Sequence, residues 1–373
     1  MGGIKLGKLL GFEISIDWSW LFIFFLVVYT LANGYFPSVY PSFDIATNWL
    51  VGVIAALLLF ASVLTHELSH SVVARAYGTD VKGITLFLFG GVSQTADEPK
   101  SAREEFWMAI VGPVTSVGLG ILFYLVGGIG VILEWPAPLI AISGYLSLIN
   151  FLLGAFNLIP GFPLDGGRVL RSAIWAATND LTRSTRYASH AGQFFGYLLM
   201  AVGFGEILTG GLVGGLWLIF IGWFLAGAAR SGYQQVLIRQ ALSGVRVEQV
   251  MTTDVPVISA DTSVRRFVDD HLLRHEYSCY PVTSNDDVIG VVGAEEVRSV
   301  PSSDWHLTPV SRITHTVDNA YKVSADDDAW NALSKLANEN VCRLLVMEDD
   351  RLKGTVGREA VFRLVQTKMQ LGV

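Results

Sequence analysis

Two histidines and a glutamate share one short segment of an otherwise apolar part of the chain. The stretch T-H-E-L-S-H-S holds His66, Glu67 and His70, which are the only titratable side chains between Asp44 and Arg75. Residues four apart on a helix project from the same face, so the two imidazoles can hold two corners of a tetrahedral zinc site. The glutamate between them is placed to accept a proton from an attacking water. The spacing predicts a hydrolytic zinc centre.

A catalytic zinc ordinarily has three protein ligands and one open position. Asp165 is the candidate for the third ligand, and it lies in N-L-I-P-G-F-P-L-D-G-G-R, residues 157–168. Pro160 and Pro163 interrupt helix geometry there, so the chain can turn this carboxylate back towards the histidines. The alternative is that Asp165 caps a helix beginning at Gly166. The residue types favour the ligand and leave the cap open.

The 373-residue chain is 51% hydrophobic and 16% charged, so it is more apolar than soluble proteins usually are. Residues 241–373 hold 14 Lys/Arg against 20 Asp/Glu. Their net charge of −6 accounts for nearly all of the formal charge of −7 of the whole chain. This acidic balance, without a basic stripe, argues against nucleic acid as a partner. Cys279 and Cys342 are too few to indicate a disulfide framework, and we expect none.

Six apolar runs without Asp, Glu, Lys or Arg are each about long enough to cross a bilayer, which takes about 20 residues. All twelve Lys and Arg of residues 1–240 fall on one side of the resulting arrangement. The positive-inside rule then predicts a multi-pass protein of the cell membrane with both termini in the cytoplasm. The predicted helices lie near residues 17–35, 47–76, 103–131, 137–159, 185–206 and 212–238.

The predicted metal site lies inside the membrane. His66 precedes Arg75 by nine residues, which places it about 13 Å from the basic edge of its helix. Ionisable side chains at such depth cost several kcal/mol and usually mark function. The segment 80–95 is apolar but too short to cross, and its β-branched and aromatic residues around Gly90 predict a small sheet close to the site.

Several motifs together resemble one family. They are H-E-L-S-H in the second apolar run, G-G-V near residue 90, G-P at 112–113, and N-L-I-P-G-F-P-L-D-G-G-R after the fourth run. These motifs resemble the site-2 protease family of intramembrane zinc metalloproteases, in its six-span branch with cytoplasmic CBS domains. The resemblance covers essentially the whole chain.

The resemblance implies a site and a substrate. It implies that His66, His70 and Asp165 bind one zinc ion, that Glu67 is the general base, and that Asn157 positions substrate or stabilises the oxyanion. It also implies that the small sheet presents an edge to unwound substrate and that the first and sixth spans form a lateral gate. The implied substrates are single-span membrane proteins, already trimmed outside the bilayer and cleaved within it.

The C-terminal part contains an internal repeat. After a membrane domain at 1–240, residues 245–300 and 308–373 repeat each other, as in V-I-G-V-V-G-A-E-E-V against L-K-G-T-V-G-R-E-A-V. Their β-α-β-β-α character resembles a CBS pair, an α+β module that often binds adenine nucleotides such as ATP. At the position of that family's ribose-binding carboxylate the first repeat has Glu296, whereas the second has Ala360. The alternatives are nucleotide binding through Glu296 and a ligand-free module that forms a homodimer.

The predicted fold is therefore six transmembrane helices with a small membrane-associated sheet, followed by a cytoplasmic α+β tandem CBS domain. A CBS-gated transporter or channel is the rival function. It would be expected to show repeated helices or ionisable residues spread over several spans. Here these residues concentrate on His66, Glu67, His70 and Asp165. A catalytically inactive relative is the third interpretation, and the intact Glu67 argues against it.

Overall fold

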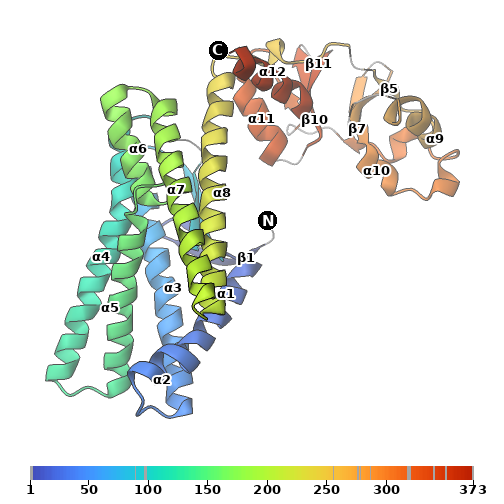
Figure 1. The fold of residues 1–373 in the computed structure, drawn as a ribbon. Coiled ribbons are helices and arrows are strands. Elements are labelled where there is room, and N and C mark those ends of the chain that lie inside the picture. The colour runs from blue at the N-terminus through green and yellow to red at the C-terminus, as the bar shows by residue number, and fades with distance from the viewer. Residues whose placement is uncertain are drawn as a thin grey trace. The chain divides into compact units, whose positions relative to one another are not determined.

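The computed structural model describes residues 3–88, 90–95, 99–254, 256–274, 277, 279–285, 287–316, 321–338, 341–348 and 351–371. The chain divides into two compact units, Met1–Gln234 and Gln235–Val373. Figure 1 shows the long helices of the first unit and the mixed helices and strands of the second. The two units are treated separately below.

Six helices are long and apolar enough to cross a membrane, which confirms the predicted count for the described residues. The first span joins α1 (Trp18–Thr30), a π-helical turn (Leu31–Tyr35) and α2 (Phe36–Val39). The others are α3 (Ile45–Ala76), α4 (Ala102–Ile132), α5 (Ala137–Asn157), α7 (Leu181–Leu208) and α8 (Leu212–Leu242).

Polar caps set where several spans begin. The Asp44 carboxylate accepts a hydrogen bond from the Thr47 backbone N–H at 2.9 Å, and the Asp180 carboxylate accepts one from the Arg183 N–H at 2.8 Å. Such caps satisfy backbone donors that the first helical turn leaves free. The cap at Asp180 explains why α7 begins four residues before the predicted position 185. Apolar content alone could not show this start.

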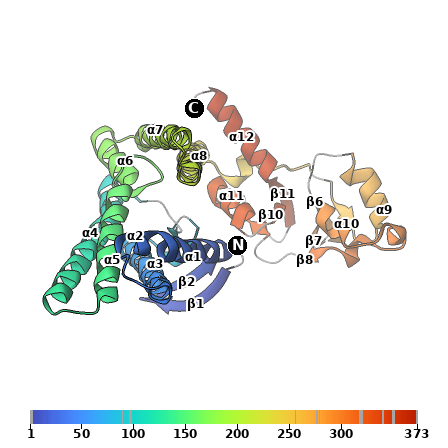
Figure 2. The same ribbon diagram turned by 60° about the horizontal axis from the view of Figure 1, so that its bottom comes forward.

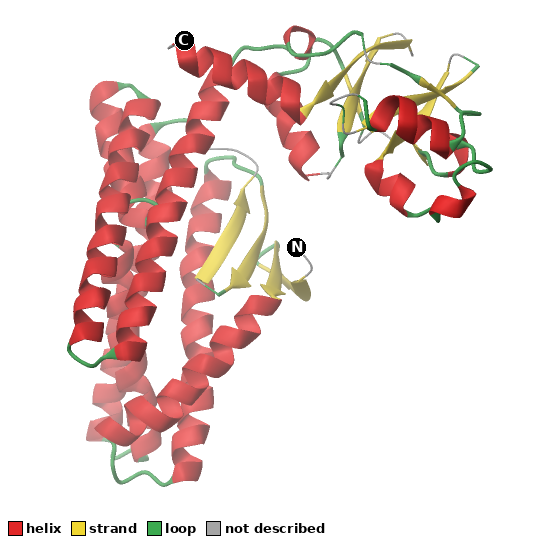
Figure 3. Cartoon of the chain, turned by 45° about the vertical axis from the view of Figure 1, so that its right-hand side comes forward, coloured by secondary structure: helices red, strands yellow, loops and turns green. Residues whose placement is uncertain are grey.

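A four-stranded sheet lies beside the helices of the first unit (Figure 3). Its order is β1-β2-β3-β4, with β1 (Gly3–Leu9), β2 (Phe12–Asp17), β3 (Val81–Phe87) and β4 (Gly90–Thr95). The hairpin of β3 and β4 confirms the predicted sheet in 80–95. The sequence analysis missed β1 and β2, although Phe12 and Ile14 alternate with polar residues. Both are buried in one apolar cluster with Leu68 of α3 and Met108 of α4, which fixes the sheet against these helices.

Helices α7 and α8 pack backbone to backbone and lie side by side in Figures 1 and 2. A Cβ atom added to Gly196 of α7 would lie 2.6 Å from the Gly222 carbonyl oxygen and 2.9 Å from the Ala226 nitrogen of α8. The Ser189 hydroxyl also donates to the Ala229 carbonyl at 2.7 Å. Small residues and interhelical hydrogen bonds are the usual means of association between helices in lipid.

The second unit repeats one arrangement of strands. In each copy a short strand runs parallel to a longer one, which pairs in turn with an antiparallel third strand. The first sheet has the order β5-β6-β7-β8 and the second β11-β10-β9. The strands are β5 (Ile258–Ser259), β6 (Cys279–Ser284), β7 (Asp287–Gly293), β8 (His315–Thr316), β9 (Lys322–Val323), β10 (Arg343–Glu348) and β11 (Arg351–Gly357). The helices are α9 (Val264–Phe267), α10 (Ala294–Arg298), α11 (Ala329–Asn338) and α12 (Arg358–Leu371).

The two copies exchange their leading segments. The Val247 N–H, at the start of the first copy, donates to the Asp327 carbonyl of the second at 2.8 Å. Reciprocally, the Val310 N–H donates to the Thr262 carbonyl at 2.8 Å. Val247 is accordingly buried in the core of the second copy and Val310 in the core of the first. Each copy is therefore completed by the other.

The expectation of no disulfide is wrong, because Cys279 and Cys342 are bonded to each other. The two cysteines begin β6 and precede β10, which are equivalent strands of the two copies. The internal symmetry brings their Cα atoms to 6.3 Å, within the range that a disulfide can bridge. A cysteine count carries no information about this proximity.

Substituting Gly196 by alanine should destabilise the α7–α8 pair. The added methyl meets backbone atoms that cannot move independently, and such overpacking typically costs about 1–3 kcal/mol. We expect a lower midpoint of thermal unfolding for Gly196→Ala in detergent. Gly205→Ala on the same helix is the matched control, because nothing lies within 4 Å of its added Cβ. Equal midpoints for the two variants would contradict this packing.

Candidate metal centre and active site

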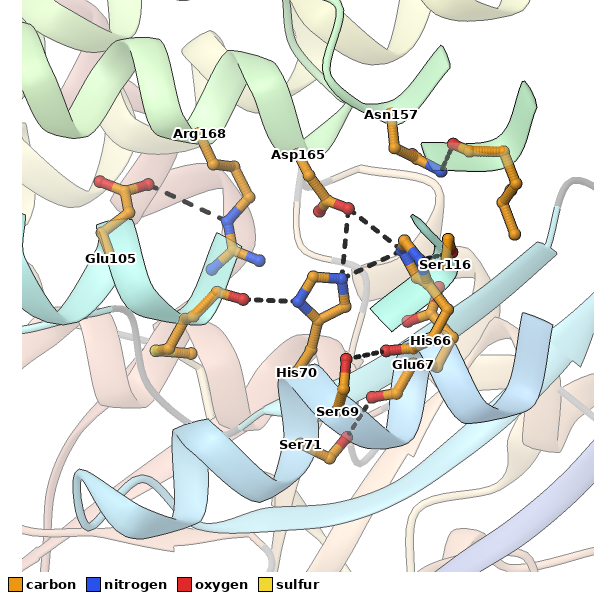
Figure 4. A network of polar contacts seen from close by, with 12 residues as sticks. His66, Glu67, Ser69, His70, Ser71, Glu105, Ser116, Asn157, Asp165 and Arg168 are labelled. Atoms are coloured by element: carbon orange, nitrogen blue, oxygen red, sulfur yellow. Dashed lines mark hydrogen bonds and ion pairs between the residues drawn. The ribbon is translucent and has the colours of Figure 1, made fainter. Parts of the chain in front are cut away.

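Three side chains from two helices converge on one point. His66 and His70 project from α3, and Asp165 is the first residue of α6 (Asp165–Thr178), a helix outside the six spans. Asp165 Oδ2 lies 3.1 Å from His66 Nε2 and 3.2 Å from His70 Nε2, and the two Nε2 atoms are 3.2 Å apart (Figure 4). Two imidazole nitrogens and one carboxylate oxygen in this arrangement could hold a metal ion.

Asp165 does not cap its helix. The N-cap position is Leu164, and it makes no side-chain capping bond. The Asp165 carboxylate instead faces the histidines. Burial alone would raise the pKa of this carboxyl, but hydrogen bonds with His66 and His70 outweigh burial and hold its pKa below the ordinary value. The ionised carboxylate is the form that binds a cation.

The hydrogen bonds around the histidines fit a metal ion. His70 Nδ1 lies 2.5 Å from the Met108 carbonyl oxygen, which can only accept, so Nδ1 carries the proton. Nε2 then either carries the second proton of an imidazolium, which donates to Asp165, or presents the lone pair of a neutral imidazole to a cation. Two acceptors at this distance require a proton or a cation between them. Outer hydrogen bonds of this kind orient metal-binding histidines in general.

One face of α4 supports the whole cluster. Its residues Glu105, Met108, Gly112 and Ser116 follow helical spacing. Met108 accepts from His70, and the Ser116 hydroxyl lies 2.9 Å from His66 Nδ1. A Cβ at Gly112 would lie 2.3 Å from His70 Nε2, so this glycine leaves the room that the imidazoles occupy. The sequence analysis missed this role of α4, for which the G-P pair at 112–113 was the one signal.

A buried ion pair joins α6 to α4. The Glu105 carboxylate is fully buried and accepts a hydrogen bond from Arg171 Nε at 2.5 Å, while Arg168 Nε lies 4.0 Å from the same oxygen. Arg168 and Arg171 follow Asp165 by about one and two turns of α6. The pairing therefore fixes the helix whose first residue is Asp165. Removing one partner of such a buried pair generally costs about 3–5 kcal/mol.

Glu67 lies in a cavity of about 610 Å³ that also contains His66, His70, Asp165 and Asn157. The structure thus brings together all five residues predicted for the membrane part of the site. Helices α1, α3, α4, α5, α6 and α8 contribute to the cavity, together with strands β3 and β4.

Strand β4 passes directly over the general-base candidate. A Cβ at Gly91 would lie 2.3 Å from Glu67 Cγ, so only a glycine allows this approach. Asn157, at the end of α5, lines the same cavity, and its Nδ2 donates to the Leu153 carbonyl of its own helix at 3.0 Å. Arg168 also lines the cavity and was not predicted. Apart from the D-G-G-R motif, nothing in the sequence indicated that the Arg168 guanidinium lies in the same cavity as Glu67 and Asp165.

Glu296, the candidate nucleotide contact, belongs to the second unit. Its carboxylate accepts a hydrogen bond from the Gly293 backbone N–H at 2.8 Å. The side chain therefore serves the first turn of its own helix α10. This bond occupies one carboxylate oxygen and leaves the other to accept from a ribose hydroxyl.

Comparisons with known proteins identify relatives of this chain. The model of Peptidase family M50 matches residues 54–134 and 132–202, and that of the CBS domain matches residues 247–303. Rip3 of Mycobacterium tuberculosis, a zinc metalloprotease by name, is 35% identical over 367 residues, covering 97% of this chain and 92% of Rip3. Zinc metalloprotease MJ0392 of Methanocaldococcus jannaschii is 30% identical over 362 residues, covering 96% and 95%.

Among solved structures, the site-2 protease from Methanocaldococcus jannaschii is 29% identical in sequence. The match covers 62% of this chain and 94% of that chain, with a TM-score of 0.42.

Substituting Gly112 by alanine should remove metal binding. The methyl would occupy the space next to both Nε2 atoms, at 2.3 Å from His70 and 2.7 Å from His66. We expect the zinc content of the variant, measured by elemental analysis of purified protein, to be well below one ion per chain. Gly118→Ala on the same helix has open space around its Cβ and should keep its zinc. A full complement of zinc in Gly112→Ala would place the metal elsewhere.

Proposed function

Because the chain belongs to peptidase family M50, the site-2 protease family of intramembrane zinc metalloproteases, we propose that His66, His70 and Asp165 bind its zinc ion and that Glu67 is its general base. The protein is a zinc metalloprotease that hydrolyses peptide bonds of membrane proteins. The observation that supports the assignment of residues is the convergence of the three ligand atoms beside Glu67 in one cavity.

The residues divide the chemistry between them. When bound, zinc supplies a Lewis acid that polarises a carbonyl and lowers the pKa of coordinated water towards 7. Glu67 accepts a proton from the attacking water and returns it to the leaving amine. Asn157 donates its amide to the carbonyl oxygen as negative charge develops there. For this the Asn157 amide exchanges its bond to Leu153 for one to substrate.

Strand β4 is the proposed docking edge for the substrate. A transmembrane helix hides its carbonyls in its own hydrogen bonds, so it must unwind before cleavage. The order β1-β2-β3-β4 leaves β4 at the edge of the sheet, with Gly91 over Glu67. An unwound substrate that pairs with β4 recovers hydrogen bonds and lies across the general base. Spans α1 and α8, which both line the cavity, form the proposed lateral gate.

The substrates and the topology complete the proposal. We propose single-span membrane proteins, trimmed outside the bilayer beforehand, as substrates. The distribution of Lys and Arg supports a cytoplasmic location for both termini and for the edge of α3 that carries Arg75. The proposed domains are a protease at 1–240 and CBS repeats at 245–300 and 308–373.

Replacing Glu67 by glutamine should separate catalysis from metal binding. Glutamine keeps the shape of the side chain but cannot accept the proton. We expect the cleavage rate of a model transmembrane substrate to fall at least ~10²-fold while zinc content stays at one ion per chain. Glu206→Gln, at the far end of α7, should cleave normally. Undiminished proteolysis by Glu67→Gln would refute the assignment, and loss of zinc would make Glu67 a ligand instead.

For the CBS pair we propose regulation of the protease, with ATP or another adenine nucleotide as ligand of the cleft near Glu296. The cleavage rate of wild-type protein should then change on addition of ATP, and this response should be lost in Glu296→Ala. Glu295→Ala changes the exposed neighbour and should respond like wild type. The absence of any ATP effect would favour the other proposal, a homodimer through the CBS pair, which sedimentation of the full chain measures.

A further inference from the structure

A second cavity lies between α7 and α8, apart from the catalytic one. Its volume is about 560 Å³, and its lining comes from the beginning of α7 together with Tyr233 of α8. It shares no lining residue with the catalytic cavity. Neither the family nor the proposed protease chemistry assigns it a role.

The cavity carries a net positive charge. Arg183, Arg186 and His190 line it, and their spacing of three and four residues places them along one face of α7. Between residues 181 and 242 the sequence has a single acidic residue, Glu206 near the far end of α7. Within the described part of the chain, neither arginine forms an ion pair with a carboxylate. Asp180, the acidic group of the lining, caps α7 through the Arg183 N–H at 2.8 Å.

Aromatic and apolar groups continue from this charged end towards the middle of the span. The Arg183 guanidinium lies 5.9 Å from the ring of Tyr187, and tyrosines are typical of the membrane–water interface. One and two turns after His190, Phe194 is 63% exposed and Leu198 is 46% exposed. The surface of α7 thus changes from cationic to aromatic to aliphatic along its length.

We propose that this cavity binds the phosphate group of an anionic ligand, with Arg183, Arg186 and His190 as its contacts, and that a membrane lipid supplies the phosphate. Guanidinium groups match phosphate geometry with paired hydrogen bonds. Basic pockets between spans at the membrane surface bind anionic lipid headgroups in this way. The exposed apolar residues that follow along α7 suit the acyl chains, which a soluble phosphate does not have.

A bound lipid would also brace the catalytic cavity. Tyr233 lies about two turns after Leu225 and about one and a half turns after Ala228 on α8, and both of these residues line the catalytic cavity. An occupant held between α7 and Tyr233 therefore restrains the helix that forms one wall of the active site. The binding itself does not depend on the proposed protease chemistry.

The test is a binding titration of the full chain in neutral detergent with dioctanoyl phosphatidylglycerol. We expect saturable binding by the wild type. The Arg183→Gln/Arg186→Gln variant should bind about 30-fold more weakly, because each basic residue near an anionic surface strengthens binding about fivefold. The Arg265→Gln/Arg266→Gln variant removes the same charge from the second unit and should bind like wild type. The midpoint of thermal unfolding shows whether each variant is folded. If the double variant does not fold, Arg186→Gln alone replaces it, with an expected loss of affinity of about fivefold.

Parallel arms identify the source of the phosphate. Dioctanoyl phosphatidylcholine, which has no net charge, should not bind saturably, and sodium phosphate should compete only weakly with phosphatidylglycerol. Equally tight binding of sodium phosphate would keep the phosphate site but overturn the lipid as its source. Equal phosphatidylglycerol affinity of wild type and the arginine variants, or no saturable binding by either, would overturn the site.

Discussion

Ionisable groups inside a membrane segment are stable only where other polar groups or a cation satisfy them, and this requirement organises the first unit. Glu105, Met108, Gly112 and Ser116 present one face of α4 to the site. Through this face α4 holds both imidazoles and, by the Glu105–Arg171 pair, the helix that begins at Asp165. The sheet, α3 and α6 all contact this helix. The catalytic geometry is therefore a property of α4 as much as of the residues that do the chemistry.

The cavity combines rigid and exchangeable contacts. The histidines are fixed by hydrogen bonds on their outer nitrogens, and Gly91 brings β4 against Glu67 without a side chain between them. The Asn157 amide, in contrast, donates to the carbonyl of Leu153 on its own helix, a partner that it can exchange. The proposed metal ligands are thus preorganised, whereas Asn157, the proposed substrate contact, remains adaptable.

Much of this arrangement was predictable from local patterns. The six spans followed from apolar runs, and His66, Glu67, His70 and Asp165 followed from metal spacing and from one family motif. Three features did not follow. Strand β2 pairs with β3, which lies far along the chain. Ser116 and Glu105 matter only through partners distant in sequence, and the Cys279–Cys342 bond depends on the symmetry of two repeats. Each of these depends on contacts between distant segments, about which local patterns carry little information.

The exchange of leading segments between the CBS copies has a consequence for the order of synthesis. Val247 emerges from the ribosome early, yet its core partners include Val361 and Val365, which emerge more than a hundred residues later. The first copy in turn lacks Val310 until the second has begun. Neither copy can close its core as a separate folding unit, so the second unit is completed only when nearly the whole chain has been made.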